Sequence, residues 1–484
     1  MAMTPDGAST ISGLGRRVMR SAVAWSFVST FVRIGANFFV LPVLLRKLPP
    51  EQLGLWYVFG SLGAFAALLD LGFEPTIMRV VSYLWAGAER LVAFGLHDDT
   101  PAGARGPNRP LLSEVVSTLR VYYRFVGLGV FVLLATAGGA WIWTRTADLP
   151  DAGLLRWAWV AYAFGESLKF VSGRWPALLA GIGELRVSQQ IVTVGSVVYY
   201  IAAVAGLLAG LRLWALVGAA LLMGIATRWL GRLAFVRTAS LPGGLPRARF
   251  HRAVFDAIWP NAWRTGLVAF GAFMIIQANT LVCSAFLDLA ATASYGISLQ
   301  LVTILVGLAS VWVQVKIPHI SQLRVTGESA AIARLFACRM RLVILSYAAG
   351  AVCIISAAPR VLEAIGSRTQ LLPANQLAVL LVIQFLEMHH SLYGALVLTE
   401  NRNPFLRPAL VSGVLIVALS ITLTPRLGVW GLLLSAGAVQ IAFNNWWPVL
   451  RAIRGLGMAP GGFGRLFFTG CLPAAEKART HGHA

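Results

Sequence analysis

The stretch SAVAWSFVSTFVRIGANFFVLPVLL, residues 21–45, determines how the rest of this chain is interpreted. As a helix it would extend roughly 37 Å at about 1.5 Å per residue, which exceeds the thickness of a bilayer's hydrocarbon core, about 30 Å. Arg33 lies near its middle, and Asn37 follows one helical turn later. A charge at that depth costs at least about 2.5 kcal/mol, so lipid will not solvate it. The stretch therefore predicts a membrane-spanning helix whose Arg33 faces a hydrated cavity or a partner.

The composition extends this interpretation to the whole chain. Of its 484 residues, 57% are apolar and only 12% are charged, which is about half the share usual in soluble proteins. The formal net charge of +21 would suggest nucleic-acid binding in a soluble protein. Here basic cytoplasmic loops and anionic lipid headgroups are sufficient explanations. We therefore predict an integral membrane protein that binds no nucleic acid.

Twelve apolar stretches are predicted to be membrane-spanning helices, because backbone polar groups in hydrocarbon must be satisfied within their own segment. They are 21–45, 53–73, 121–143, 157–181, 189–210, 213–235, 260–283, 293–317, 341–358, 374–398, 407–424 and 427–449. The fold class is thus expected to be all-α, with six spans on each side of the glycine- and proline-rich segment 237–256. We predict an N-terminal six-helix lobe over 1–240, a C-terminal six-helix lobe over 241–455 and a cytoplasmic tail over 456–484.

The Lys and Arg residues are distributed unequally between the two sides of this alternating topology. Of 40 such residues, four lie within spans and 36 lie outside them. Eight of the 36 fall on one side, and the remaining 28 fall on the side that carries both termini. Because basic residues accumulate in cytoplasmic loops, both termini are predicted to be cytoplasmic.

The segment from Leu53 to Arg79 resembles the polysaccharide transporters. It contains Leu-Gly-Leu-Trp-Tyr at 53–57 and Asp-Leu-Gly-Phe at 70–73, and a weaker echo, Trp-Val-Gln-Val-Lys-Ile-Pro, lies at 312–318. These transporters belong to the MATE-like multidrug, oligosaccharidyl-lipid and polysaccharide exporter superfamily, and the resemblance also covers the layout of twelve spans in two lobes.

The resemblance implies an O-antigen-type flippase of the bacterial inner membrane. Such a protein moves undecaprenyl-diphosphate-linked oligosaccharides from the cytoplasmic to the periplasmic leaflet by alternating access, for synthesis of lipopolysaccharide or exopolysaccharide. The implied partners are a lipid-linked oligosaccharide, membrane lipids and the polysaccharide polymerase machinery.

Basic residues inside the predicted spans are the candidates for binding an anionic headgroup. Arg33 and Arg264 begin the two lobes, and a guanidinium makes bidentate contacts with phosphate oxygens. We expect them, with Asn37, to line a substrate cavity. For Arg264, which lies only a few residues inside its span, the alternative is a side chain that extends to the membrane surface.

The fourth predicted span adds three charged residues. Glu166 and Lys169 are three residues apart, so they lie on one helix face and can pair. Arg174 follows. Lys169 and Arg174 are further candidates for the substrate cavity. The pair is either structural or opens when an anionic substrate competes for the lysine.

Four other charged residues are candidates for coupling or gating. Asp70 and Arg79 flank a turn after the second span, where an ordinary interfacial ion pair is the alternative. Glu387 and His390 share one face of the tenth span. Histidine titrates near neutral pH, so this pair is a hypothetical site of coupling to proton movement.

Two other functions remain as alternatives. A small-molecule exporter of the same superfamily is the first, and its cavity for cations should be lined by carboxylates. The second is a membrane polysaccharide polymerase or ligase, which would need a sizeable external loop. The chain contains no G-x-x-x-x-G-K-[ST], H-E-x-x-H or G-x-S-x-G motif. We therefore predict a non-enzyme without a cofactor or a metal.

Overall fold

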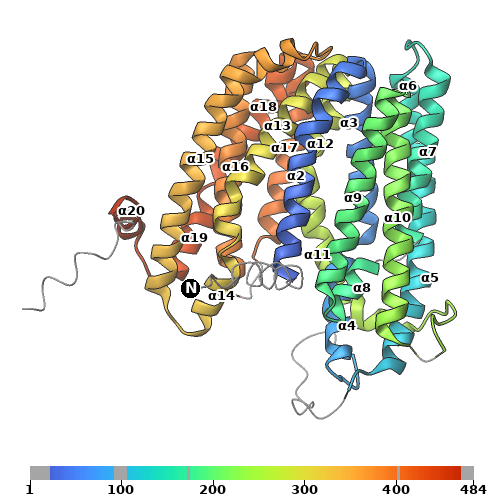
Figure 1. Cartoon of the computed structure of the whole chain (residues 1–484). Coiled ribbons are helices and arrows are strands. Elements are labelled where there is room, and N and C mark those ends of the chain that lie inside the picture. Colours follow the sequence, from blue (N-terminus) through green and yellow to red (C-terminus); the bar gives the residue numbers. More distant parts are fainter. Residues whose placement is uncertain (1–21, 92–105, 172–174, 242, 401–403, 470–484) are drawn as a thin grey trace, which may run out of the picture. The chain divides into compact units, whose positions relative to one another are not determined.

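The computed structural model describes residues 22–91, 106–171, 175–241, 243–400 and 404–469. These ranges form helices joined by short connections, and they contain no β-strand (Figure 1). The chain divides into two compact units. Unit 1 runs up to Phe273 and includes Ile365–Thr369, and unit 2 comprises Met274–Ala364 and the residues from Gln370 onward. The two units thus divide within a helix, between Phe273 and Met274, whereas the predicted lobe boundary lies between residues 240 and 241. The two functional lobes stay a prediction.

Unit 1 is a bundle in which α5 packs against α7, and α10 packs against both α7 and α9 (Figure 1). Its helices are α2 (Ala22–Lys47), α3 (Pro50–Ala67), η1 (Leu68–Asp70), α4 (Phe73–Trp85), α5 (Arg109–Leu133), η2 (Leu134–Gly138), α6 (Gly139–Arg145), α7 (Ala152–Val171), α8 (Trp175–Gly181), α9 (Leu185–Leu208), α10 (Leu213–Ala239) and most of α11 (Arg252–Ile276).

In unit 2, α13 packs against α15 and α16, and α17 packs against α18. Its helices are α12 (Ala278–Phe286), α13 (Leu289–Gln314), α14 (Ile317–Val325), α15 (Ser329–Ala364), α16 (Ala374–Leu398), α17 (Leu406–Leu427), α18 (Val429–Val439), η3 (Gln440–Asn444), α19 (Trp447–Gly455) and α20 (Pro460–Thr469). The segments η2 and η3 are single π-helical turns.

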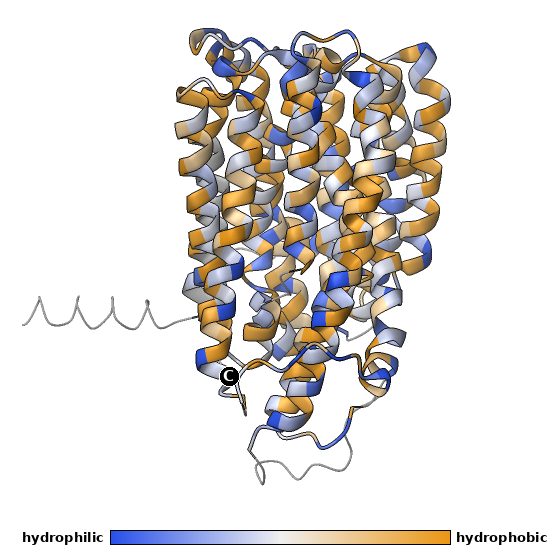
Figure 2. Ribbon diagram, turned by 90° about the vertical axis from the view of Figure 1, so that its right-hand side faces the viewer, coloured by the Kyte–Doolittle hydropathy of each residue, from blue (hydrophilic) through white to orange (hydrophobic). Residues whose placement is uncertain are grey.

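The prediction of an all-α membrane protein is confirmed. Among the described helices, eight are long and apolar enough to cross a membrane, and a ninth is counted if α11 and α12 form one bent span. In their described residues, the twelve predicted ranges lie mainly on helices. Nine of the ranges correspond to these candidate spans, and the remaining three lie on α2, α7–α8 and α18–α19. Figure 2 shows that the middle stretches of the helices are mainly hydrophobic, whereas hydrophilic residues are frequent at the ends and in the loops.

Several predicted boundaries were wrong because local chemistry interrupts or extends a helix. The described residues of the range 157–181 lie on α7 and α8, and α8 has a proline at its second position. The range 260–283 is bent by 43° at Gln277. The range 341–358 is the middle of α15, which has 36 residues. The helix of the range 121–143 begins earlier than predicted, at Arg109, because Asn108 caps α5 by accepting a hydrogen bond from the N–H of Leu111.

The core of unit 1 contains aromatic side chains whose polar atoms are satisfied. Trp159 on α7 is fully buried, and its ring lies 4.8 Å from that of Phe59 on α3. Its indole N–H donates to the carbonyl oxygen of Leu134 at 3.0 Å. That carbonyl belongs to the π-helical turn η2, so the indole compensates for the irregular hydrogen bonding there.

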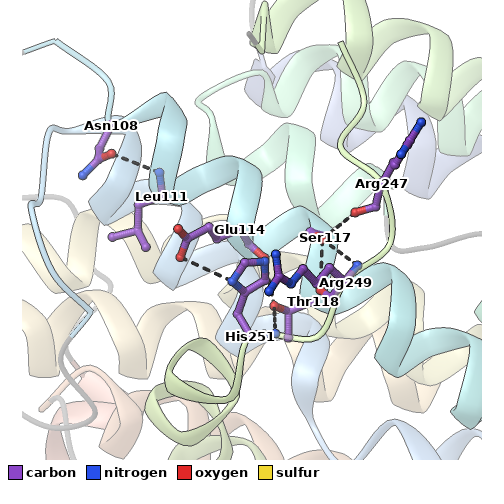
Figure 3. A network of polar contacts seen from close by, with 8 residues as sticks. All are labelled: Asn108, Leu111, Glu114, Ser117, Thr118, Arg247, Arg249 and His251. Carbon is purple, nitrogen blue, oxygen red and sulfur yellow. Dashed lines mark hydrogen bonds and ion pairs between the residues drawn. The ribbon is translucent and has the colours of Figure 1, made fainter. Parts of the chain in front are cut away.

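The connection into α11 is held along α5 by side-chain hydrogen bonds to its backbone (Figure 3). We call residues 246–251 the linker segment. The Ser117 hydroxyl lies 2.6 Å from the carbonyl oxygen of Arg247 and 2.9 Å from that of Arg249, and it accepts from the N–H of Arg249 at 2.8 Å. One buried hydroxyl thus fixes two residues of an extended segment.

Further contacts fix both ends of the linker segment. At its start, Arg120 donates to the carbonyl oxygen of Pro246. At its end, the N–H of His251 donates to Thr118 Oγ1 at 3.1 Å, and His251 Nδ1 lies 3.8 Å from a carboxylate oxygen of Glu114 (Figure 3). The direction in which α11 begins is therefore set by α5.

Candidate functional site

The first polar site in unit 1 is the turn between α3 and α4. Asp70 is buried there, with 8% of its surface exposed. Its carboxylate accepts a hydrogen bond from Tyr123 Oη at 2.8 Å and another from the N–H of Glu74 at 3.2 Å. The second bond places the carboxylate at the beginning of α4, where it satisfies a free backbone N–H.

The turn itself requires an unusual backbone. Leu71 and Gly72 both have positive φ angles, 51° and 71°. A Cβ atom at Gly72 would lie only 2.7 Å from the carbonyl oxygen of Ala262 and 2.7 Å from the N atom of Gly266. The absence of side chains at the two glycines therefore lets the turn lie directly against α11, which positions Asp70 beside that helix.

A groove of about 570 Å³ opens at this turn. Two carboxylate residues line it, Asp70 and Glu74, and neutral polar residues from α9 and α11 complete its polar wall. Those neutral residues are Ser188, Gln189 and Thr265. No Lys or Arg is among the described residues that line the groove, and the charged groups among them are acidic.

The predicted gating residue Arg79 does not share this site with Asp70. Arg79 is exposed on α4, and no ion pair joins it to Asp70 in the described part of the chain. The polar partner that sequence reasoning missed is Tyr123, because it lies 53 residues away and only the packing of α5 brings it close. Asp70 itself could be identified from the sequence, because it is a carboxylate at the end of an apolar span.

The predicted basic cavity residues lie in different places. Arg264 is exposed, and its guanidinium carbon lies 5.3 Å from the centre of the Trp263 ring. The side chains of Arg33 and Asn37 on α2 lie outside the described residues, and so does Arg174. A cationic substrate cavity therefore stays a prediction.

The ion pair expected within the fourth span is present. Lys169 Nζ lies 2.5 Å from Glu166 Oε1, with 39% and 11% of the two side chains exposed. Glu166 is thus the buried partner, and Lys169 compensates its charge at the edge of α7. Their part in substrate binding or gating stays a prediction.

Unit 2 contains a second polar site inside apolar helices. Glu387 and His390 lie on one face of α16, as their spacing predicted, and His390 Nε2 lies 3.6 Å from Glu387 Oε1. Only 19% of the Glu387 side chain and 16% of the His390 side chain are exposed. The second carboxylate oxygen of Glu387 accepts a hydrogen bond from the Gln440 side-chain amide. The acid is therefore held between a titratable group and an amide.

The π-helical turn η3 and the residue that follows it, Asn445, supply the rest of this site. His389 Nδ1 lies 2.9 Å from Asn445 Oδ1, and Ser412 on α17 donates to Asn444 Oδ1 at 2.5 Å. Gln440 is almost fully buried, and among the described residues its amide oxygen has no hydrogen-bond partner. Single π-turns are frequent at functional sites, and the extra residue here turns three amide side chains toward α16 and α17.

Sequence reasoning missed the amides of η3, although a signal existed. Gln440 and Asn444 are four residues apart in an otherwise apolar predicted span, so they share a helix face. Polar residues at membrane depth normally face the protein interior. That these side chains meet Glu387 rather than another helix is decided by the packing of α16 against η3.

Comparisons with known proteins give matches at the level of structure. No protein-family model and no curated protein matches this sequence. The inward-facing conformation of a multidrug resistance MATE family transporter of the MOP superfamily has 13% sequence identity and a TM-score of 0.61, and the match covers 90% of this chain and 99% of that chain.

Two further solved structures match over similar lengths. A MOP superfamily transporter from Pyrococcus furiosus, described by a reverse polarity of its binding pocket that suggests a different function, has 13% identity and a TM-score of 0.56, with coverage of 92% and 98%. The MATE multidrug transporter DinF-BH, solved in complex with a small molecule, has 12% identity and a TM-score of 0.55, with coverage of 93% and 96%. At these identities the similarity is one of fold, and the chain has the fold of MATE transporters of the MOP superfamily.

Proposed function

We propose that this protein is a multi-pass membrane transporter that exports cationic small molecules. The observation that carries the proposal is the groove in unit 1, whose charged lining residues in the described structure are Asp70 and Glu74. Its volume of about 570 Å³ lies in the range usual for small-molecule sites, roughly 300–1,000 Å³. Structural neighbours that are multidrug transporters support the same class of function.

The charged residues in the described lining of the groove favour a cation over an anionic headgroup. Among the described lining residues the charged groups are two carboxylates, and carboxylates attract cations and repel a diphosphate. The largely apolar remainder of the lining, including Leu68, Met78 and Val192, suits an amphiphilic molecule. This supports the small-molecule alternative over the flippase that the sequence resemblance implies.

Cation efflux in cells tests this function. We expect Glu74→Gln to raise the KM for ethidium efflux by about fivefold, which is the effect of losing a charge contact worth about 1 kcal/mol in a water-filled groove. Asp70→Asn should have a larger effect, since Asp70 also holds Tyr123. Asp148→Asn removes an exposed carboxylate of unit 1 outside the groove and is the matched control. Equal efflux by Glu74→Gln and the control would contradict the proposal.

Export of a cation requires coupling to another gradient. Moving one positive charge outward costs about 2.3 kcal/mol per 100 mV of membrane potential. Glu387 is the candidate for proton binding, because its half-buried carboxylate contacts both the imidazole of His390 and the amide of Gln440. Protonation would change both contacts and so could alter the packing of α16 against η3.

The role of Glu387 is tested by the pH dependence of transport. In proteoliposomes, Glu387→Gln should transport several-fold more slowly, and its rate should no longer respond to an imposed pH gradient. Glu363→Gln removes an exposed carboxylate of unit 2 and should retain the response. A normal rate and a normal pH response in Glu387→Gln would exclude this residue from coupling.

The lipid-linked oligosaccharide flippase is the second candidate function, and the resemblance of Leu53 to Arg79 to polysaccharide transporters favours it. A strain that depends on this protein for surface polysaccharide distinguishes the two. In a flippase, Arg33→Ala should accumulate lipid-linked precursor without loss of expression, and ethidium efflux should be absent. In the small-molecule exporter, precursor levels should be unchanged while Glu74→Gln alters efflux.

A further inference from the structure

A second groove, in unit 2, has a different character from the site of the proposed function. It lies between α17 and the consecutive elements α18 and η3, and its volume is about 400 Å³. Nearly all of its lining is apolar, contributed by residues such as Val411, Leu415 and Phe443. These three side chains are 55%, 48% and 41% exposed. The groove is therefore open along one side of apolar helices.

One end of this groove carries a positive charge. Arg407, in the first turn of α17, lines the groove and is exposed, and in the described ranges it makes no ion pair or hydrogen bond. Among the described lining residues it is the only charged one. An apolar channel with a cation at one end is complementary to a molecule with an anionic head and a hydrocarbon tail.

Aromatic residues and a second arginine surround the Arg407 end. The ring of Trp447 lies 5.7 Å from that of Phe405 and 6.4 Å from that of Phe443, and the guanidinium carbon of Arg451 lies 5.8 Å from its centre. The Arg451 Nε atom is buried and has no hydrogen-bond partner among the described residues. Tryptophans are enriched at the membrane–water interface, so this end is expected at headgroup depth.

The length of the groove suits one leaflet. From Arg407 to Leu419, the last α17 residue in the lining, twelve residues of helix extend about 18 Å at about 1.5 Å per residue. One leaflet contributes roughly half of the hydrocarbon core, about 15 Å. An acyl chain that follows the groove would thus keep its headgroup beside Arg407 and its end near the bilayer centre.

We propose that this groove binds one acyl chain of an anionic glycerophospholipid, with the phosphate on Arg407. The site is independent of the exporter function proposed above. Its inner wall includes Ser412, which is hydrogen-bonded to Asn444 of η3, so the bound chain packs against the π-helical turn of unit 2. The bound lipid thereby covers residues of this turn that are otherwise exposed.

Native mass spectrometry of the purified full-length protein, titrated with phosphatidylglycerol and with phosphatidylcholine, tests the headgroup contact. Arg407→Ala should weaken phosphatidylglycerol binding by about fivefold, the effect expected for one basic residue at an anionic surface. Binding of phosphatidylcholine, which has no net charge, should change little. Arg426→Ala is the matched control, because it removes an exposed arginine from the last turn of the same helix.

A second pair of variants tests the acyl chain. Leu415→Trp should fill the groove and reduce binding of both lipids, whereas Val414→Trp adds the same side chain at the neighbouring position, which is 56% exposed and lies outside the groove lining. The proposal is overturned if Arg407→Ala behaves like Arg426→Ala, or if the two tryptophan variants bind equally. It is also overturned if undecaprenyl phosphate binds in the groove and phosphatidylglycerol does not.

Discussion

Trp159 illustrates, at the scale of single residues, how a polar atom is accommodated in an apolar helix bundle. We expect Trp159→Phe to destabilise the protein by about 1–3 kcal/mol, because it removes the hydrogen bond to the Leu134 carbonyl and leaves space in the core. Trp157→Phe is the control, since Trp157 lies on the same helix but is 65% exposed. Thermal unfolding of the purified variants measures the difference, and equal unfolding temperatures would contradict the role of the indole.

Gly72 gives a second prediction at the residue scale. Gly72→Ala should cost about 2–5 kcal/mol, because the left-handed backbone disfavours a Cβ and because that atom would collide with α11. Gly183→Ala separates the two causes. Gly183 also has a positive φ, 87°, but no atom lies within 4 Å of its Cβ position, so only the backbone cost of about 1–2 kcal/mol should appear. If both variants lose the same stability, the close contact with α11 is unimportant.

At the scale of elements, the linker segment depends on one hydroxyl of α5. Ser117→Ala removes the hydroxyl that contacts Arg247 and Arg249, and the N–H of Arg249 then loses its hydrogen-bond acceptor. We expect the amide of Arg249 to exchange its hydrogen about fivefold faster, since a hydrogen bond contributes about 1 kcal/mol. Ser113→Ala, one turn earlier on α5, should leave this exchange unchanged. Equal exchange in both variants would show that Ser117 does not hold the segment.

The irregular elements were also the least predictable ones. Apolar length predicted the long helices, but it did not predict the bend at Gln277 or the π-turn that begins at Gln440. The π-turns contact other helices: the indole of Trp159 on α7 donates to η2, and η3 packs against α16. A local sequence pattern contains no information about such partners.

At the scale of the whole molecule, membrane orientation can be tested. In unit 1, Asp151 pairs with Arg212 at 3.6 Å near the end of α6, whereas the linker segment lies at the start of α5. About 40 Å of helix separates Ser117 from Arg145 at about 1.5 Å per residue. In a background without other cysteines, Asp148→Cys should react with a membrane-impermeant maleimide in intact cells. Arg247→Cys should react only after permeabilisation, and the reverse result would invert the predicted topology.

The sequence by itself determined that this chain is an all-α membrane protein, because the length of apolar runs and the cost of burying charge are local properties. It also placed Asp70, Glu166, Glu387 and His390 among the polar residues of apolar helices. Only the tertiary structure decided which groups they meet. Asp70 contacts Tyr123, and Glu387 contacts Gln440. In each pair the two residues are 53 positions apart in the sequence, and the packing of their helices brings them together. The tertiary structure likewise brought Asp70 and Glu74 together with polar residues of α9 and α11 in the lining of one groove, which no single helix could do.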